Sequence, residues 1–227
     1  MKVLVIAAHP DDEALGCAGA LLWHQARGDE VSIALLGDGV SSRGQQGEIL
    51  QQDIEDRARA ARAFAAYVHA GLHLPGGFKD NCFDTVPFLE IVQTIEGLIG
   101  KCQPDLVYTH YGWDLNIDHV ITARAVLTAL RPGCGHQVRR LLAFEVLSST
   151  EWQSPALAAA FAPNFFVDIT SFLPAKLEAL ACYQDELRPF PFPRSREGVE
   201  HLAAYRGMQA GVKAAEAFML IREVCSS

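Results

Sequence analysis

The hydrophobic positions of this chain follow two patterns that alternate from one end to the other. Short continuous apolar runs, partly β-branched, are typical of strands that are buried on both faces of a sheet. Such runs predict strands at residues 3–8, 30–36, 72–74, 105–109, 141–147 and 165–169. Longer segments with an apolar residue every three or four positions are typical of helices. They predict helices at residues 13–27, 48–70, 86–101, 119–130, 171–187 and 197–211. Residues 216–222 fit either a last strand or a last helical turn.

This alternation predicts an α/β fold, in the form of a single Rossmann-like domain whose mostly parallel sheet has helices on both faces. The sequence contains no internal repeat, low-complexity tract or linker, so we expect one domain over residues 1–227. Ligands of such folds bind beyond the carboxyl ends of the strands. The polar residues that directly follow a predicted strand are therefore the first candidates for a functional site.

Charge and composition exclude some classes of binding partner and some locations. With 19 Lys and Arg against 27 Asp and Glu, the formal net charge is −8, so we expect no binding to nucleic acid or to an anionic membrane surface. No apolar run approaches the roughly 20 residues of a transmembrane segment. Residues 9–13 also interrupt the first apolar run too early for a signal peptide. The six cysteines are widely spaced without a CxxC pair, which is typical of reduced thiols, and we expect a cytoplasmic protein.

The first candidate cluster is His9-Pro10-Asp11-Asp12-Glu13, directly after the first predicted strand. Asp and Glu are favoured at the cap and in the first turn of a helix, so a structural role is one interpretation. One imidazole and three carboxylates so close together also suit Zn²⁺, so a metal or catalytic role is the other. The spacing alone leaves both interpretations open.

The second candidate cluster runs from His110 to His119 and follows another predicted strand. It contains two histidines and two aspartates. If the first and fourth strands are neighbours in the sheet, His119 can face His9 and Asp12. A solvated loop in which Asp118 caps the next helix is the alternative. For His110 taken alone, such a structural role is the more common case.

Together the two clusters resemble the LmbE/PIG-L family of zinc-dependent N-deacetylases, through Ala8–Glu13 and through Asn116-Ile117-Asp118-His119. The resemblance covers nearly the whole chain. It implies that His9, Asp12 and His119 bind one zinc ion, or another divalent metal, and that Asp11 is the general base. Three protein ligands leave a fourth position open, which is typical of catalytic zinc. Asp11 would take a proton from the attacking water and pass it to the leaving amine.

The sequence departs from many members of this family at the residue expected to stabilise the oxyanion. Those members have a histidine three positions before the last metal ligand, where this chain has Asn116. Either Asn116 donates a hydrogen bond as a neutral group, or His110 moves in from the end of its strand. Asp118 would position whichever residue is used, or support a metal ligand.

Four further residues are candidates for binding the substrate. Arg43 lies in a Gly- and Ser-rich segment and could hold sugar hydroxyls or a phosphate, with a solvated surface arginine as an equal alternative. Asp80 and Asn81 lie in a predicted loop and have the same two interpretations. Trp113 could stack on a sugar ring or serve only in packing.

The resemblance implies a hydrolase of linear amide C–N bonds that removes the acetyl group from an N-acetylated amino sugar. The expected substrate is of the N-acetylglucosamine type, linked to a nucleotide or another carrier in glycan synthesis. One alternative is a related amidase that acts on a thiol conjugate. The other is a non-catalytic Rossmann-like module that binds a nucleotide or sugar, although the first turn has carboxylates where a G-x-G-x-x-G motif would be needed. The Phe- and Pro-rich segment 190–193 predicts a homo-oligomer.

Overall fold

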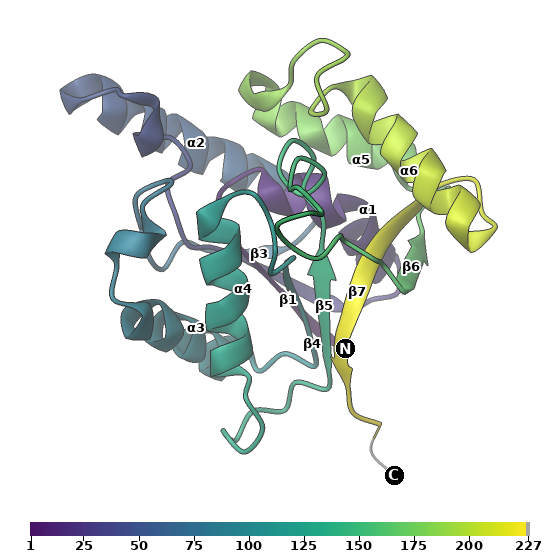
Figure 1. Ribbon diagram of the computed structural model, residues 1–227, viewed down its shortest axis with the longest axis horizontal. Coiled ribbons are helices and arrows are strands. Elements are labelled where there is room, and N and C mark those ends of the chain that lie inside the picture. Colours follow the sequence, from purple (N-terminus) through teal and green to yellow (C-terminus); the bar gives the residue numbers. More distant parts are fainter. Residues whose placement is uncertain (226–227) are drawn as a thin grey trace.

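Seven strands form one sheet in the computed structural model, which describes residues 1–225 (Figure 1). In sheet order the strands are β3 (Gly71–His73), β2 (Glu30–Leu35), β1 (Lys2–Ala7), β4 (Leu106–His110), β5 (Arg140–Phe144), β7 (Ala215–Glu223) and β6 (Phe165–Asp168). Strand β7 pairs antiparallel with both β5 and β6, and the remaining pairings are parallel. The predicted α/β fold with a mostly parallel sheet is confirmed.

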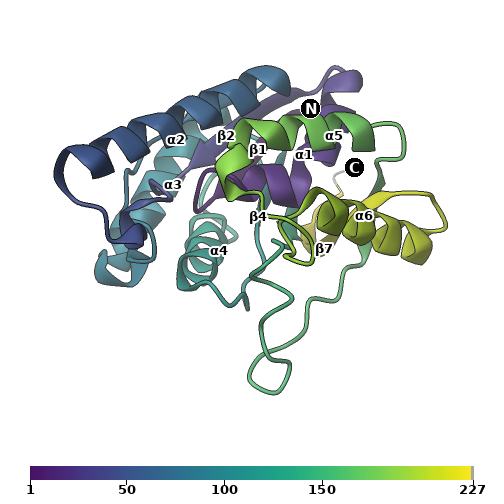
Figure 2. The ribbon, with the colours of Figure 1, turned by 90° about the horizontal axis from the view of Figure 1, so that it is seen from above.

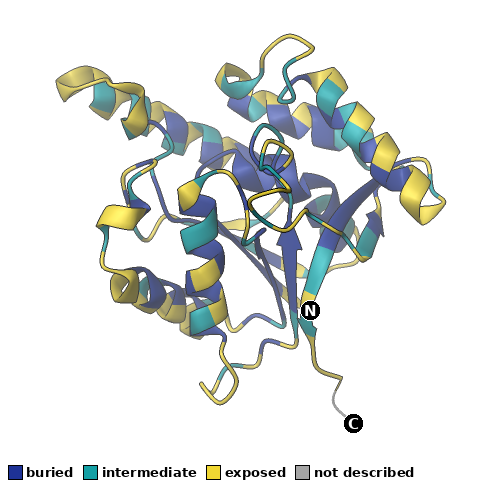
Figure 3. Cartoon of the chain, in the orientation of Figure 1, coloured by how far each residue is buried: buried dark blue, intermediate teal, exposed yellow. Residues whose placement is uncertain are grey.

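Helices cover both faces of this sheet (Figure 2). One face packs against α1 (Asp12–Ala26), α2 (Gly47–Tyr67), α5 (Leu173–Ala179) and α6 (Arg196–Ala210). The other packs against α3 (Phe88–Cys102) and α4 (Ile117–Ala129). Because neighbouring side chains of a strand point to opposite faces, Val3 and Val5 of β1 enter the first core and Leu4 and Ile6 the second. This two-sided burial, visible along the central strands in Figure 3, explains why these strands are continuous apolar runs.

Several predicted elements differ in their bounds from the observed ones, and the structure decides the alternative left open for residues 216–222. The helix predicted at 171–187 is broken: α5 ends at Ala179 and a 3₁₀ segment, Leu180–Glu186, follows, with Tyr183 at a non-helical φ of −111°. Strand β5 ends at Phe144 rather than at residue 147, because the chain turns where Thr150 N–H donates to the Val146 carbonyl. The helix predicted at 119–130 begins at Ile117, and residues 216–222 belong to strand β7.

The sheet order places both candidate clusters at one edge. Strands β2 and β3 extend the sheet on one side of β1. The chain then crosses to the other side of β1 to form β4, so the order of the strands reverses between β1 and β4. Ligands of open α/β sheets bind at such a switch point, outside the carboxyl ends of the strands. The first cluster follows β1, and the second begins at His110, the last residue of β4.

The helices and the segment around Phe190 bear on two of the expectations about membranes and partners. No helix within residues 1–225 is long and apolar enough to cross a membrane. Phe190, in the segment that led us to expect a homo-oligomer, has 56 % of its surface exposed, and the oligomer stays a prediction.

Candidate active site

The turn after β1 is held by its own carboxylates. The Asp12 carboxylate accepts a hydrogen bond from His9 N–H at 2.9 Å, and Glu13 accepts one from Asp11 N–H at 3.0 Å. Asp11 has a φ of 118°, a conformation that non-glycine residues rarely adopt, and its carbonyl accepts the first hydrogen bonds of α1 from Ala14 and Leu15. Strain of this kind persists only where surrounding contacts enforce it, and it is frequent at functional sites.

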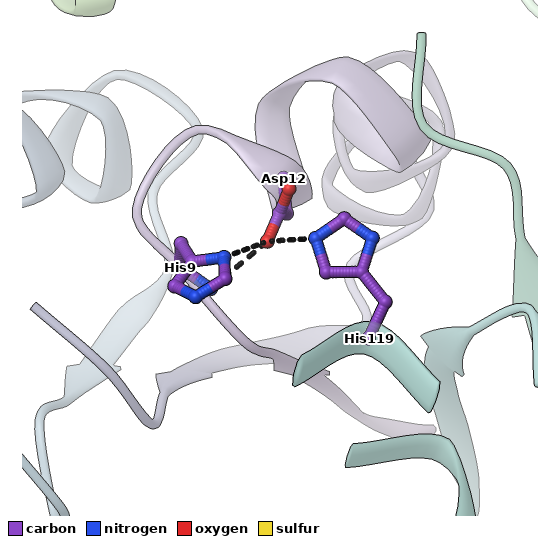
Figure 4. Close-up of side chains that lie close together, drawn as sticks. All are labelled: His9, Asp12 and His119. Atoms are coloured by element: carbon purple, nitrogen blue, oxygen red, sulfur yellow. Dashed lines mark hydrogen bonds and ion pairs between the residues drawn. The ribbon is translucent and has the colours of Figure 1, made fainter. Parts of the chain in front are cut away.

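Three side chains from the two clusters converge beside this turn (Figure 4). Asp12 Oδ2 lies 3.4 Å from His9 Nδ1 and 3.3 Å from His119 Nε2. All three residues are buried, and their ligand atoms lie within 4.8 Å of one another, close enough to share one metal ion. The sequence-based expectation that His119 faces His9 and Asp12 is met because β1 and β4 are neighbours.

Carboxylates behind the two histidines fix their orientation. His9 Nε2 lies 2.9 Å from Asp118 Oδ2, and His119 Nδ1 lies 3.3 Å from Asp114 Oδ1. In the neutral form that binds a metal, we assign the ring N–H to these outer nitrogens, which leaves the lone pairs of His9 Nδ1 and His119 Nε2 on the side of Asp12. Metal-binding histidines commonly have such an outer carboxylate, which sets the tautomer and strengthens the ligand.

The donor set also fits a divalent cation by its unsatisfied groups and its charge. Within the part of the chain that the structure describes, Asp12 Oδ1 and both ring nitrogens of His119 are buried without a hydrogen-bond partner, and the contact of His119 Nδ1 with Asp114 is an ion-pair contact. Burial lowers the pKa of His9, but hydrogen bonds to Asp118 and Asp12 outweigh this effect and raise the pKa to about 10. Burial likewise lowers the pKa of His119, and the charge of Asp12 above all raises it to about 9. The carboxylates thus favour positive charge at this point, and nitrogen and oxygen donors suit zinc.

A second group, His9 with Asp80 and Asp118, is also close enough to hold an ion. Its Asp118 oxygens already accept backbone hydrogen bonds from Asn81 at 2.7 Å and Phe83 at 3.0 Å, in addition to the His9 contact. Asp118 therefore has less capacity to bind a metal, and the set containing His119 fits better.

Asp11 lies next to this centre and is held by an arginine. Arg194 donates a hydrogen bond from one guanidinium nitrogen to Asp11 Oδ2 at 2.8 Å, and Arg57 lies 3.9 Å from the same oxygen. Burial raises the pKa of Asp11 to about 6, although the charge of Arg194 opposes the shift. A carboxylate with a pKa near neutrality can both accept and return a proton.

The two residues proposed to assist the oxyanion have different environments. His110 is fully buried, stacks on His119 with ring centroids 3.9 Å apart, and its Nε2 accepts the Ala8 N–H at 2.8 Å. Burial lowers the pKa of His110 well below its ordinary value, so the ring is neutral. Its Nε2 is already used as the acceptor for the Ala8 N–H. The movement that we considered for His110 would break this bond. Asn116 is only half-buried, and its side-chain nitrogen remains able to donate.

Asn116 is also the N-cap of α4, a role that the sequence suggested for Asp118. The Asn116 Oδ1 accepts a hydrogen bond from Asp118 N–H at 2.9 Å. Asp118 lies inside the first turn and is fully buried, where it joins His9 to the loop at Asn81 and Phe83. The alternative of a solvated loop in which Asp118 caps the next helix is wrong, because Asn116 is the cap and Asp118 is buried.

The residues proposed to contact substrate differ in how far they are buried. Asp80 is buried, 3.2 Å from His9 Nε2, and accepts hydrogen bonds from the Ser42 hydroxyl and the Asn81 amide. The side chain of Arg43 is 43 % exposed and pairs with Glu186, while Trp113 is 52 % exposed. Asp80 and Asn81 therefore adjoin the histidine cluster, whereas Arg43 and Trp113 are surface groups.

Several residues that shape the site carried no functional prediction. They are Arg57, Asp114, Tyr183, Glu186 and Arg194. Tyr183 donates its hydroxyl proton to Glu13 at 2.5 Å, and Glu186 pairs with Arg57 and Arg43. The only sequence signal was the place of Asp114 within the second cluster. The others depend on contacts between segments far apart in the chain.

The sequence matches the PIG-L family, described as GlcNAc-PI de-N-acetylase, over residues 4–130. A relative from Mycolicibacterium smegmatis, 1D-myo-inositol 2-acetamido-2-deoxy-alpha-D-glucopyranoside deacetylase, is 27 % identical over 161 residues. The alignment covers 56 % of this chain and 54 % of the relative, so the chain spans about half the length of that protein.

Solved structures share the fold over nearly the whole chain. The conserved protein TT1542 from Thermus thermophilus is 25 % identical with a TM-score of 0.75, over 100 % of this chain and 97 % of that one. N,N'-diacetylchitobiose deacetylase from Pyrococcus horikoshii is 20 % identical with a TM-score of 0.76, over 97 % and 84 %. GalB, the 4-carboxy-2-hydroxymuconate hydratase of Pseudomonas putida, is 21 % identical with a TM-score of 0.77, over 100 % and 99 %. Since a hydratase has this fold too, the reaction has to be argued from the site.

Proposed function

Because the chain belongs to the PIG-L family, we propose that it is a zinc-dependent hydrolase that removes the acetyl group from an N-acetylated amino sugar. The observation that carries this proposal is the convergence of His9, Asp12 and His119, with Asp11 beside them and outside the ligand set. A carboxylate next to a three-ligand metal site is an arrangement that supports metal-assisted amide hydrolysis. We further propose that residues 1–227 form one deacetylase domain.

The metal would be held by His9 Nδ1, Asp12 and His119 Nε2. When bound, a zinc ion there supplies a Lewis acid for the acetyl carbonyl and lowers the pKa of water toward neutrality. Asp114 and Asp118 contribute by holding the two histidine rings in the tautomer that binds metal.

Asp11 is the proposed proton carrier. It accepts a proton from the water that attacks the acetyl carbon, and it returns that proton to the sugar nitrogen as the C–N bond breaks. The second proton of the water stays on the carboxyl group, so the products are the free amine and acetic acid, which then ionises to acetate in solution. The pKa of about 6 supports both steps, because the carboxylate is ionised at neutral pH and its conjugate acid is strong enough to protonate the leaving group.

Asn116 is the proposed donor to the developing oxyanion. Its Oδ1 is fixed by Asp118 N–H, and its backbone N–H donates to Asp114 Oδ1 at 3.0 Å. The bond to Asp118 N–H holds the side chain at the start of α4, and within residues 1–225 Nδ2 has no hydrogen-bond partner, so it is the proposed donor. A preorganised amide donor contributes more to the transition state than to the ground state.

The proposed substrate is an amino sugar of the N-acetylglucosamine type, attached to a nucleotide or another carrier. Buried Asp80 beside His9 offers an acceptor for sugar hydroxyls close to the centre. The exposed Trp113 and Arg43 provide an aromatic face and a guanidinium farther out, where a carrier would lie.

A panel of N-acetylated compounds tests the proposal. Purified protein with added zinc is incubated with free, nucleotide-linked and inositol-linked N-acetylglucosamine and with an acetylated thiol conjugate, and freed amine is measured with fluorescamine. Amine release from one of the sugars supports the proposal, and release from the thiol conjugate alone supports the related amidase. Protein that binds no zinc at micromolar concentration and frees no amine would show that the hydrolase assignment is wrong.

A further inference from the structure

One guanidinium reaches the Asp11 carboxylate from the opposite end of the chain. Arg194 donates to Asp11 Oδ2 at 2.8 Å across a separation of 183 residues. The Asp11 side chain is 8 % exposed and that of Arg194 is 18 % exposed, so water screens this contact weakly. Within residues 1–225, no hydrogen bond to the other oxygen, Oδ1, accompanies it.

The guanidinium is itself fixed by the loop after β5. Arg194 Nε donates to the Leu147 carbonyl at 3.1 Å and to the Ser148 hydroxyl at 2.7 Å. The fork of an arginine can direct one edge to the protein and another nitrogen to a carboxylate, which a lysine ammonium cannot reproduce. The orientation of Arg194 toward Asp11 is therefore set by two acceptors, the Leu147 carbonyl and the Ser148 hydroxyl, which share the Nε–H.

The backbone on both sides of Arg194 is also held. Arg188 N–H donates to the Arg194 carbonyl at 3.0 Å, which closes the segment 188–194 on itself. Ser195 is the N-cap of α6 and accepts from Gly198 N–H at 2.9 Å. A β-carbon at Gly198 would collide with the Pro193 carbonyl, so the segment packs tightly against the start of the helix.

From these contacts we infer that Arg194 is a positioning residue, which fixes Oδ2 of Asp11 and leaves Oδ1 directed to the reacting water. The assignment of Asp11 as proton acceptor rests on the proposed function. The backbone of Asp11 is held at a φ of 118° by Glu13, and Arg194 removes the remaining freedom of the short side chain. A displacement of about 1 Å in a catalytic group can cost on the order of 10²-fold in rate.

The first test does not depend on activity. In metal-free protein, unfolding by urea is compared for the wild type, Asp11→Asn, Arg194→Met and the double variant. We expect a coupling of at least about 10-fold in the unfolding equilibrium constant, as for a poorly solvated charge pair. Arg196→Met serves as the control in the same segment, because its side chain is 61 % exposed and pairs with Glu200. A coupling below about 2-fold in the unfolding equilibrium constant, equal to that of the control, would show that Arg194 does not interact with Asp11 in the folded protein.

The second test separates positioning from a merely structural role. We expect Arg194→Met to lower kcat by about 10–100-fold, with KM and zinc content nearly unchanged. In the Asp11→Asn background, the same substitution should change the residual rate less than about 2-fold, because Arg194 acts only through the Asp11 carboxylate.

Added guanidinium gives a further readout. At millimolar concentration it should partly restore kcat of the Arg194→Met variant and leave kcat of the Asp11→Asn variant unchanged. An equal loss in both backgrounds overturns the inference. If the wild type hydrolyses no amide, the proposed function fails, while the unfolding cycle still decides whether Arg194 fixes Asp11.

Discussion

Zinc binding to the metal-free protein should release about two protons at pH 7.5. The pKa of His9 is raised to about 10 and that of His119 to about 9, so both rings carry a proton at this pH. Both must be neutral to bind a metal. The pKa of Asp12 is lowered well below its ordinary value because the facing histidines outweigh the effect of burial, so Asp12 has no proton to lose. The zinc affinity should therefore rise by about 100-fold per pH unit up to pH ~9.

Calorimetry in buffers of different ionisation enthalpy measures this number directly. The metal is first removed with a chelator, and zinc is then titrated at pH 7.5, where the slope of observed heat against buffer enthalpy gives the protons released. Trp113→Ala is a suitable control because Trp113 is 52 % exposed, and it should release the same two protons. Release of less than one proton, or an affinity that is constant between pH 6.5 and 8.5, would refute the reasoning about the two histidines.

Four further outcomes follow from the contacts and charges of the site. Asp118→Asn should raise the Kd for zinc by about 10–100-fold because His9 loses its outer carboxylate, and an unchanged Kd in a competition titration would contradict this role. Asn116→Ala should lower kcat by about 10²–10³-fold with little change in KM. His110→Ala should reduce stability by about 1–3 kcal/mol, because the Ala8 N–H loses its acceptor. Asn116→Ala also removes the N-cap of α4, at a cost of about 1 kcal/mol, so the steady-state kinetics of the two variants, and not their urea unfolding, distinguish them. The raised pKa values of the metal-binding histidines stabilise the folded metal-free protein below pH ~6.5, and this contribution is lost as pH rises through about 9 and 10. Its Tm should therefore fall over that range, and a Tm that stays constant would argue against charged histidines.

The sequence predicts the parts of this protein that depend on local pattern. The strands appear as apolar runs because both faces of the sheet are covered. These runs alternate along the chain with segments of helical periodicity, and this alternation predicts the α/β fold. The switch between β1 and β4 then brings His9, Asp12 and His119 together. The metal set could be expected early because two of its three members lie in one turn and the third follows a neighbouring strand.

The remaining features depend on contacts that no local pattern encodes. Arg194 meets Asp11 only because the chain after Leu187 folds back over the centre, and an arginine beside prolines carries no such signal in the sequence. The break at Tyr183 depends on a buried partner, Glu13, which lies 170 residues away. Asn116 and Asp118 are both good N-caps by residue type, so only the geometry of the helix start decides between them.

The central claim is tested most directly by measuring acetate release and metal content together for the wild type and Asp11→Asn. We expect the zinc-loaded wild type to free acetate and amine in equal amounts from an N-acetylated amino sugar. We expect Asp11→Asn to keep one zinc per chain and to be slower by about 10²–10⁴-fold, because the amide accepts no proton. A wild type that binds zinc but frees no acetate from any such sugar, or an Asp11→Asn variant that loses its metal, would contradict the account.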